Sequence, residues 1–469
     1  MGSHVTDTVR KSIVDIDIFN DNPGALMYGM LCADLSSAVW LTLATYLKYP
    51  VSTTHSIIGA IVGFSLAYGG RTAVDWKKIG FIVLSWIASP LIAGIFAFTI
   101  YYILQRFVFK SVNSFKYTLV LFPVLTFFTF FINILFIIYK GTPNLNLDEM
   151  EFWKCFLISF GISTFTAILA QYAYIPYVKR KLNNKNQHII ENNNNYNNDN
   201  SNDNGNAIEL GIRTKSYIEA HSNTLEENNN YIYNKNESIE FNINQAKEYA
   251  NKLEKTKIKN DIDYHHENAI KIDKDSDELC SWIQIITACF SSFAHGSNDV
   301  ANAIAPLATI FAIYNTGYLT DKTDVPIWIL VVGGVGIVIG LSTWGYKIID
   351  RIGRELTKIT PSRGFVVELA AATTVIIASR AEIPVSTTHC QVGSILGCGL
   401  TSGFKNIKWS LVKGILFSWL ITLPFTGFLS AALFSFGYYS PYNGYNISSG
   451  QFDLISGSGS DNGIYSEEL

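Results

Sequence analysis

The chain has 469 residues, of which 48% are hydrophobic and 16% charged, whereas soluble domains carry about 25% charged residues. This composition is typical of a membrane protein. The formal net charge is −3, with 35 basic and 38 acidic side chains. No overall basic field therefore exists that would attract nucleic acid.

Apolar stretches long enough to cross a bilayer, which takes about 20 helical residues, recur along the chain. We expect membrane helices near residues 24–48, 79–104, 117–139, 152–177, 281–312, 326–344, 361–379 and 410–436. Two shorter, Gly-rich runs, 52–69 and 386–400, each begin with Ser-Thr-Thr-His. Short, Gly-interrupted segments at corresponding positions of two halves indicate broken or re-entrant helices that line a transport site. The sequence predicts an all-α polytopic membrane protein with about ten spans.

The middle of the chain differs in composition from the rest. Residues 178–279 hold 32 of the 73 charged residues, and about a quarter of them are Asn. Such a stretch has too few apolar residues to bury a core, so we predict a disordered cytoplasmic loop. The loop separates a first transporter repeat with linking spans, 1–177, from a second repeat, 280–436. An extracellular polar tail, 437–469, follows.

Basic residues near the span ends indicate the orientation of the chain in the membrane. Most of them lie on the cytoplasmic side if each apolar run, the short ones included, crosses once. The loop with Arg71, Lys77 and Lys78 is an exception, because the same count places it outside. We expect a multi-pass protein of the plasma membrane.

The two short runs belong to an internal repeat. Residues 50–66 read PVSTTHSIIGAIVGFSL and residues 384–400 read PVSTTHCQVGSILGCGL, which agree at 10 of 17 positions with an offset of 334. At this offset Asp34 corresponds to Glu368. An odd number of crossings separates the copies, so they lie in opposite orientations. Inverted repeats favour an alternating-access transporter, and a channel is the alternative.

The repeat also predicts what precedes Met1. Residues 2–11 resemble residues 345–354, so the first copy lacks a counterpart of the roughly 64 residues from Ser281 to Trp344. We therefore expect the chain to be truncated at its start.

The second repeat contains the sequence AHGSNDVANA, residues 294–303. Because an acid within a span costs several kcal/mol unless it is paired, solvated or bound to an ion, Asp299 is a candidate functional residue. Asn298 and Asn302 lie about one helical turn apart and share a helix face. Gly296 and Ser297 permit a helix break whose free amide groups would meet an anion.

Hydroxyl residues follow the proline of each repeat motif, in the pattern of a helix start with N-cap hydroxyls. The helix dipole and the N–H and O–H donors there suit an oxyanion that must be released again. A carboxylate repels such an anion, so Asp299 is the better Na⁺ ligand. Hydrogen bonding between helices is the alternative role of these hydroxyls. They belong to Ser52, Thr53 and Thr54 and to Ser386, Thr387 and Thr388.

The remaining ionisable residues in these segments leave two roles open. His55 and His389 complete the motifs and either donate to an anion, take a proton or make structural hydrogen bonds. Asp34 and Glu368 are candidate cation or proton carriers, or pair with basic residues to fix helix packing. A structural role is favoured for His295.

The sequence AHGSNDVANAIAP at 294–306 resembles the GANDVANA signature of the inorganic phosphate transporter (PiT) family. Both PVSTTH motifs and Glu368 in its Glu-Leu-Ala context resemble that family too. The Asn-rich insertion is most similar to that of malaria-parasite members. The resemblance implies sodium-driven phosphate symport and an inverted-repeat fold of about twelve spans. It also implies that phosphate and sodium are held by Asn298, Asp299, Asn302, Ser386, Thr387, Thr388, Ser52, Thr53 and Thr54.

The resemblance implies inorganic phosphate, sodium ions and the lipid bilayer as partners, no nucleic acid and no resident cofactor. A homodimer is compatible with it. Two alternatives are a truncated chain that acts as a membrane scaffold or is a gene-model fragment, and a transporter of another oxyanion such as sulfate. An enzyme is not expected, because the sequence shows no nucleophile–base pair, nucleotide-binding loop or metal cluster.

Overall fold

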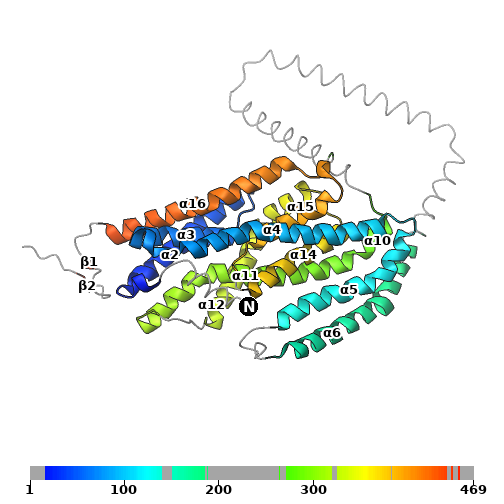
Figure 1. Ribbon diagram of the computed structural model, residues 1–469, viewed down its shortest axis with the longest axis horizontal. Helices are drawn as coiled ribbons and strands as arrows, with labels where there is room; N and C mark the ends of the chain where they lie inside the picture. Colours follow the sequence, from blue (N-terminus) through cyan, green and yellow to red (C-terminus); the bar gives the residue numbers. More distant parts are fainter. Residues whose placement is uncertain are drawn as a thin grey trace, which may run out of the picture. The chain divides into compact units, whose positions relative to one another are not determined.

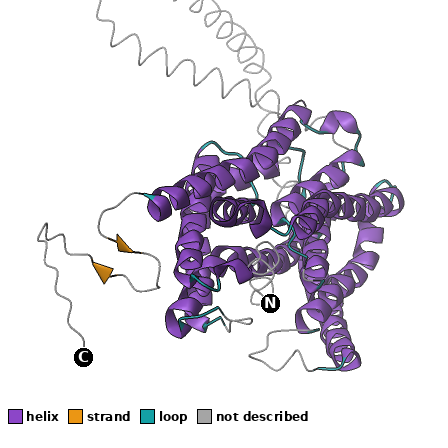
Figure 2. Ribbon diagram, turned by 60° about the vertical axis from the view of Figure 1, so that its left-hand side comes forward, coloured by secondary structure: helices purple, strands orange, loops and turns teal. Residues whose placement is uncertain are grey.

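The computed structural model describes residues 16–139, 150–184, 271–319, 325–381 and 383–440, together with residues 187, 264, 445–446 and 453–454. Figure 2 shows that these residues are almost entirely helical. The chain divides into two compact units, Met1–Ala167 with His265–Leu469, and Ile168–Tyr264. Every candidate site residue belongs to the first unit.

The described helices differ widely in length, and most of them belong to the first unit (Figure 1). The α-helices are α2 (Pro23–Tyr46), α3 (Thr53–Gly69), α4 (Trp76–Leu104), α5 (Ser114–Ile138), α6 (Phe152–Leu169), α10 (Lys274–Leu279), α11 (Ser281–Thr316), α12 (Ile327–Gly340), α13 (Tyr346–Asp350), α14 (Pro361–Arg380), α15 (Thr387–Leu400) and α16 (Trp409–Tyr439). The 3₁₀ and π segments are η1 (Ile16–Phe19), η2 (Gly70–Ala73), η3 (Gln105–Phe109), η5 (Ala170–Tyr174), η6 (Leu341–Gly345), η7 (Arg351–Glu355) and η8 (Phe404–Asn406). Two two-residue strands, β1 (Tyr445–Asn446) and β2 (Asp453–Leu454), pair in antiparallel fashion.

The prediction of an all-α membrane protein is confirmed, and all eight long apolar stretches lie on helices. Seven of the described helical segments are long and apolar enough to cross a membrane. Helix α11 is longer, with 36 residues. Helices α3 and α15 have 17 and 14 residues, which at 1.5 Å per residue span about 26 and 21 Å, less than the roughly 30 Å of hydrocarbon. The total of about ten spans and the inverted orientation stay predictions.

Several helix ends follow from local sequence. The Asn22 side chain accepts a hydrogen bond from the backbone N–H of Ala25, and Pro23 occupies the first turn of α2. Asp75 caps α4 in the same way by accepting from the N–H of Lys78. Helix α11 ends at Gly317, whose φ of 76° lies in the left-handed region that favours glycine.

The predicted break at Gly296 and Ser297 is wrong, because α11 runs through both residues without interruption. The Ser297 hydroxyl donates to the carbonyl of Ala294 at 2.9 Å, one turn earlier in the same helix. Glycine lowers helix stability by about 1 kcal/mol, which a long, packed helix tolerates. The starts of α3 and α15, which have unpaired first-turn amide groups as every helix start does, are therefore the sites for an anion in this region.

The predicted loop at 178–279 falls largely outside the described residues. Both of its ends are helical: the segment that begins with α6 continues to Asn184, and α10 covers Lys274–Leu279. Helix α10 forms because Asp273 caps it, accepting from the N–H of Ser276 at 3.0 Å. The stretch before Ile16 is also not described, so the expected truncation stays a prediction.

The two helices that begin in the repeat motifs, α3 and α15, each pack against a long helix of the other repeat (Figure 1). Helix α3 crosses α16, where Gly63 lies so close to Gly427 that a Cβ atom on Gly63 would run into the Gly427 carbonyl oxygen. Helix α15 crosses α4 in the same way, with Gly397 against the Gly94 carbonyl. Gly63 and Gly397 are 334 positions apart. Equivalent residues of the two repeats thus make equivalent contacts, and each contact joins one repeat to the other.

Candidate transport site

The starts of α3 and α15 have the same local geometry. The Ser52 hydroxyl accepts a hydrogen bond from the backbone N–H of His55 at 3.2 Å, and Ser386 accepts from the N–H of His389 at 3.2 Å. Both serines are buried. The predicted N-caps are therefore confirmed, and each repeat motif starts a helix inside the protein.

Asp299 of α11 joins the two helix starts. The Thr53 hydroxyl donates to Asp299 Oδ1 at 2.9 Å. The Thr387 hydroxyl lies 3.2 Å from Oδ1 and 3.1 Å from Oδ2 of the same carboxylate. The structure thus brings together the acid of one motif and the first threonine of each of the other two, which are more than 80 residues from Asp299 in either direction along the chain.

The second threonines link the two motifs directly. The Thr54 hydroxyl donates to the carbonyl of Val385, and the Thr388 hydroxyl donates to the carbonyl of Val51, both at 3.3 Å. These two contacts are equivalent at the 334-residue offset. The second threonine of each motif therefore binds the backbone carbonyl of the valine that precedes the N-cap serine of the other motif.

The amides of α11 complete this cluster. Asn302 Nδ2 donates to the Thr54 hydroxyl at 2.8 Å, and Asn298 Nδ2 donates to the Val385 carbonyl at 3.3 Å. The side-chain oxygens of Asn298 and Asn302 are buried and have no hydrogen-bond partner among the described residues. A buried acceptor without a donor costs about 1–3 kcal/mol. Carboxylate, amide and hydroxyl oxygens are ligands for hard cations, so these free acceptors fit a bound Na⁺.

The motif histidines lie in a clasp of two aromatic pairs. The His55 ring lies 3.6 Å from the Trp86 ring, and the His389 ring 3.6 Å from the Trp419 ring. His389 Nδ1 lies 3.1 Å from the Trp86 carbonyl oxygen, and His55 makes the reciprocal bond to the backbone of Trp419. Since a carbonyl only accepts, the proton of His389 is on Nδ1. We call these four residues the His–Trp clasp; it links α3 and α15 to both α4 and α16.

The two repeat-related acids lie apart from the Asp299 cluster and in different surroundings. Glu368 accepts from Gln391 Nε2 at 3.0 Å and from the Ser291 hydroxyl. Ser291 also contacts His295 Nδ1 at 3.3 Å, so His295 belongs to the surroundings of Glu368. Asp34 lies half-buried on α2, where Ile57 takes the place that Gln391 has in the second repeat. The described hydrogen bonds do not connect Asp34 or Glu368 to Asp299.

Sequence reasoning missed the contribution of the backbone and of the tryptophans. The carbonyls of Val51 and Val385 accept from hydroxyls, but a carbonyl is present at every position and gives no sequence signal. Trp86 and Trp419 do have a signal, because Ser85-Trp86 aligns with Ser418-Trp419 with a one-residue slip. The sequence does not show that these tryptophans contact the motif histidines, because the contacts form between residues of different helices.

The clasp predicts a measurable contribution to stability. Replacing His389 by Phe keeps an aromatic ring on Trp419 but leaves the buried Trp86 carbonyl without its donor. We expect the free energy of unfolding to fall by about 1–3 kcal/mol, measured as a lower midpoint of thermal unfolding in detergent. Tyr439→Phe is the control: it removes an exposed hydroxyl bond to the Ala67 carbonyl and should change stability by less than about 0.5 kcal/mol. Equal midpoints for both variants would contradict a role for the clasp.

Comparison with known proteins agrees with this geometry. The model of the phosphate transporter family (PHO4) matches residues 1–430. Sodium-dependent phosphate transporter 1 of Homo sapiens is 28% identical over 92% of this chain and 87% of the relative, and transporter 1-B of Danio rerio is 29% identical over 92% and 86%. A solved structure described as the sodium-dependent phosphate transporter is 28% identical, covers 94% of this chain and 86% of that chain, and gives a TM-score of 0.68. These relatives are transporters and not enzymes, and the chain belongs to the phosphate transporter family.

Proposed function

We propose that this protein is a secondary transporter that moves inorganic phosphate together with Na⁺ across the plasma membrane. The observation that carries the proposal is the position of Asp299, whose carboxylate accepts from the first threonine of both motif helices. The relatives, which are named sodium-dependent phosphate transporters, support the same cargo. Phosphate and Na⁺ are substrates here, and the proposal requires no resident cofactor.

Charge divides the site between its two substrates. Na⁺ binds the Asp299 carboxylate, with the free side-chain oxygens of Asn298 and Asn302 as further ligands. Phosphate takes the hydroxyls and the N–H groups at the starts of α3 and α15, where the positive ends of two helix dipoles also favour an anion. The hydroxyl residues concerned are Ser52, Thr53, Thr54, Ser386, Thr387 and Thr388.

The same contacts supply a reason for coupling. A threonine hydroxyl has one hydrogen to donate, and Thr53 and Thr387 both donate it to Asp299. Phosphate needs those hydrogens and is repelled by the bare carboxylate. Na⁺ on Asp299 offsets the negative charge and lets the hydroxyls turn towards the anion. The substrates therefore favour each other's binding, as symport requires.

Asp34 and Glu368 are proposed as additional cation or proton carriers, because both are acids within membrane helices. Gln391 and Ser291 hold Glu368 in place, whereas Ile57 offers Asp34 no such contact. The two acids would therefore differ in affinity for a cation. The homodimer and the origin in a malaria parasite stay predictions.

The proposal is tested with the full chain in proteoliposomes, by radiolabelled phosphate uptake under an inward Na⁺ gradient and under a K⁺ gradient of equal size. We expect uptake only with Na⁺, and we expect excess sulfate to leave it unchanged. Uptake that ignores Na⁺ would contradict the assigned cation, and competition by sulfate would favour the alternative of a broader oxyanion transporter. Absence of uptake by correctly folded protein would favour the scaffold alternative.

A further inference from the structure

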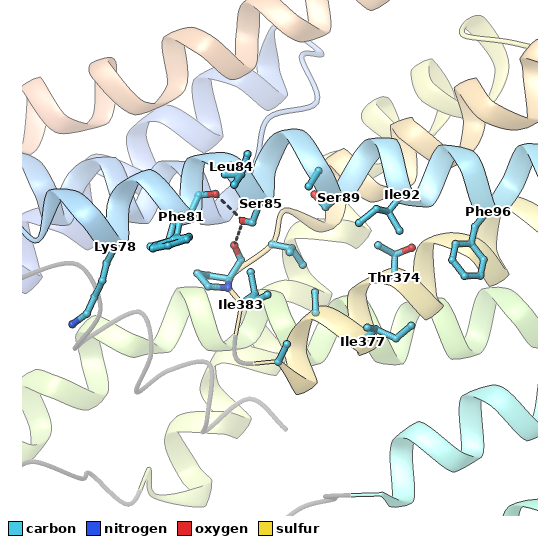
Figure 3. Close-up of a pocket in the computed structure, with 16 residues that line it drawn as sticks. Lys78, Phe81, Leu84, Ser85, Ser89, Ile92, Phe96, Thr374, Ile377 and Ile383 are labelled. Atoms are coloured by element: carbon cyan, nitrogen blue, oxygen red, sulfur yellow. Dashed lines mark hydrogen bonds between the residues drawn. The ribbon is translucent and has the colours of Figure 1, made fainter.

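A groove of about 550 Å³ runs along α4, between that helix, the end of α14 and the extended link that leads to α15 (Figure 3). Lys78 lies at one end and Phe96 at the other, a rise of about 27 Å along the helix. Apolar side chains dominate the lining. Several of them are exposed within the membrane-spanning part of the helix, among them Phe81 at 64%. The groove therefore opens towards the hydrocarbon of the bilayer.

The two repeats differ in the residues at this place, and one of the differences concerns a large side chain. In the first repeat Trp40 fills the space between α2 and α16: its Nε1 donates to the Thr422 hydroxyl at 3.0 Å, and its ring lies 4.5 Å from that of Phe425. At the 334-residue offset Trp40 corresponds to Thr374 on α14, which lines the groove beside α4. A threonine therefore stands where the other repeat has an indole, and the smaller side chain leaves more room at this position.

Two of the three hydroxyl side chains that line the groove donate to backbone carbonyls, and the third, Ser89, is only 3% exposed. Ser85 donates to the carbonyls of Ile82 and Pro384, at 2.7 and 3.1 Å, and Thr374 donates to the Ala370 carbonyl at 2.8 Å. Figure 3 shows Ser85 turned towards the link. An occupant therefore finds few polar partners along this length, and hydrocarbon is the matching chemistry.

The mouth of the groove has the opposite character. The Lys78 ammonium lies 3.3 Å from the Asp75 carboxylate, and its side chain is 53% exposed. An ammonium has three donors, so Lys78 can also bind a phosphate oxygen. Lys78, in the first turn of α4, belongs to the basic stretch that the count of crossings predicts to lie outside, as an exception to the charge rule.

We propose that the groove binds one acyl chain of a membrane phospholipid, with the lipid phosphate at Lys78. The acyl chain lies against Pro384 and Val385. The Val385 carbonyl accepts from both Asn298 and Thr54. The lipid therefore touches the link that positions α15. The proposal does not depend on which substrate the protein transports.

The test uses the full chain in phosphatidylcholine vesicles that contain a fraction of phosphatidylcholine with a photoactivatable group on one acyl chain. After illumination, labelled peptides are mapped by mass spectrometry. We expect labelling to concentrate between Phe81 and Phe96 and between Ile377 and Val385. Equal labelling at Leu420 of α16, which is more exposed at 77% but lies outside the groove, would overturn the proposal.

Variants then separate the groove from general lipid contact. Thr374→Trp copies Trp40 of the first repeat and should abolish the labelling by filling the groove; Thr374→Phe serves if the larger residue prevents folding. Leu91→Trp adds the same ring to an exposed position of α4 outside the groove and should leave labelling unchanged. Lys78→Gln should reduce it, since the headgroup contact is lost. Labelling that persists in both Thr374 variants would overturn the acyl site, and an unchanged Lys78→Gln result would overturn the headgroup contact.

Discussion

Replacing Asp299 by Asn is expected to lower Na⁺-dependent phosphate uptake at least about tenfold. We expect the main cause to be a lower affinity for Na⁺. The variant keeps the size of the side chain but loses the negative charge to which the Thr53 and Thr387 hydroxyls donate hydrogen bonds. A hydrogen bond to a charged group contributes about 1.5–3 kcal/mol, and 1.4 kcal/mol is a factor of ten in affinity. Initial rates over a series of Na⁺ concentrations measure the effect.

The matched control is Asp350→Asn, which removes an acid from the exposed helix α13. Its carboxylate pairs with Arg354 at 3.1 Å on the surface, where ion pairs contribute about 0–1 kcal/mol. Uptake by this variant should equal that of the parent chain. A normal Na⁺ response of Asp299→Asn in folded protein would refute the assigned role of Asp299.

Replacing Gly397 by Ala is expected to prevent α15 from packing on α4. The added Cβ would meet the carbonyl oxygen and backbone carbons of Gly94. A clash between backbones cannot be relieved by a side-chain rotation, so the cost should reach the upper end of the roughly 1–3 kcal/mol seen for overpacked cores, or exceed it. Gly63→Ala should act equally through Gly427, because the two crossings are equivalent. The yield of monodisperse protein and the midpoint of thermal unfolding measure both effects.

Gly80→Ala tests whether packing, and not helix propensity, causes this loss. Gly80 lies on α4, and a Cβ there meets no atom within 4 Å among the described residues. Alanine is the better helix former by about 1 kcal/mol, so this variant should be as stable as the parent or more so. A loss as large as that of Gly397→Ala would contradict the close crossing.

The sequence predicted the membrane helices because their apolar length is a local property, and it predicted the starts of α3 and α15 because proline and N-cap hydroxyls act locally. The internal repeat also identified both groups of hydroxyl residues, 52–54 and 386–388. The predicted break at Gly296 was wrong, since packing over a 36-residue helix outweighs the weak preference of one glycine. The hydrogen bonds from Thr54 to the Val385 carbonyl and from Thr388 to the Val51 carbonyl could not be predicted from the sequence, because they depend on how the two repeats pack against each other. The roles of the named site residues in binding stay predictions.

The crossed packing of the short helices has a consequence for synthesis in the cell. Helix α3 leaves the ribosome early, but its partner α16 is the last of the labelled α-helices to be made. Until then the surface around Gly63 has no partner and must be shielded by lipid or by a chaperone in the membrane. Neither repeat can complete its own packing, so two separately expressed halves should be degraded when alone and rescued when produced together. The first repeat can therefore complete its packing only after α16 has been synthesised.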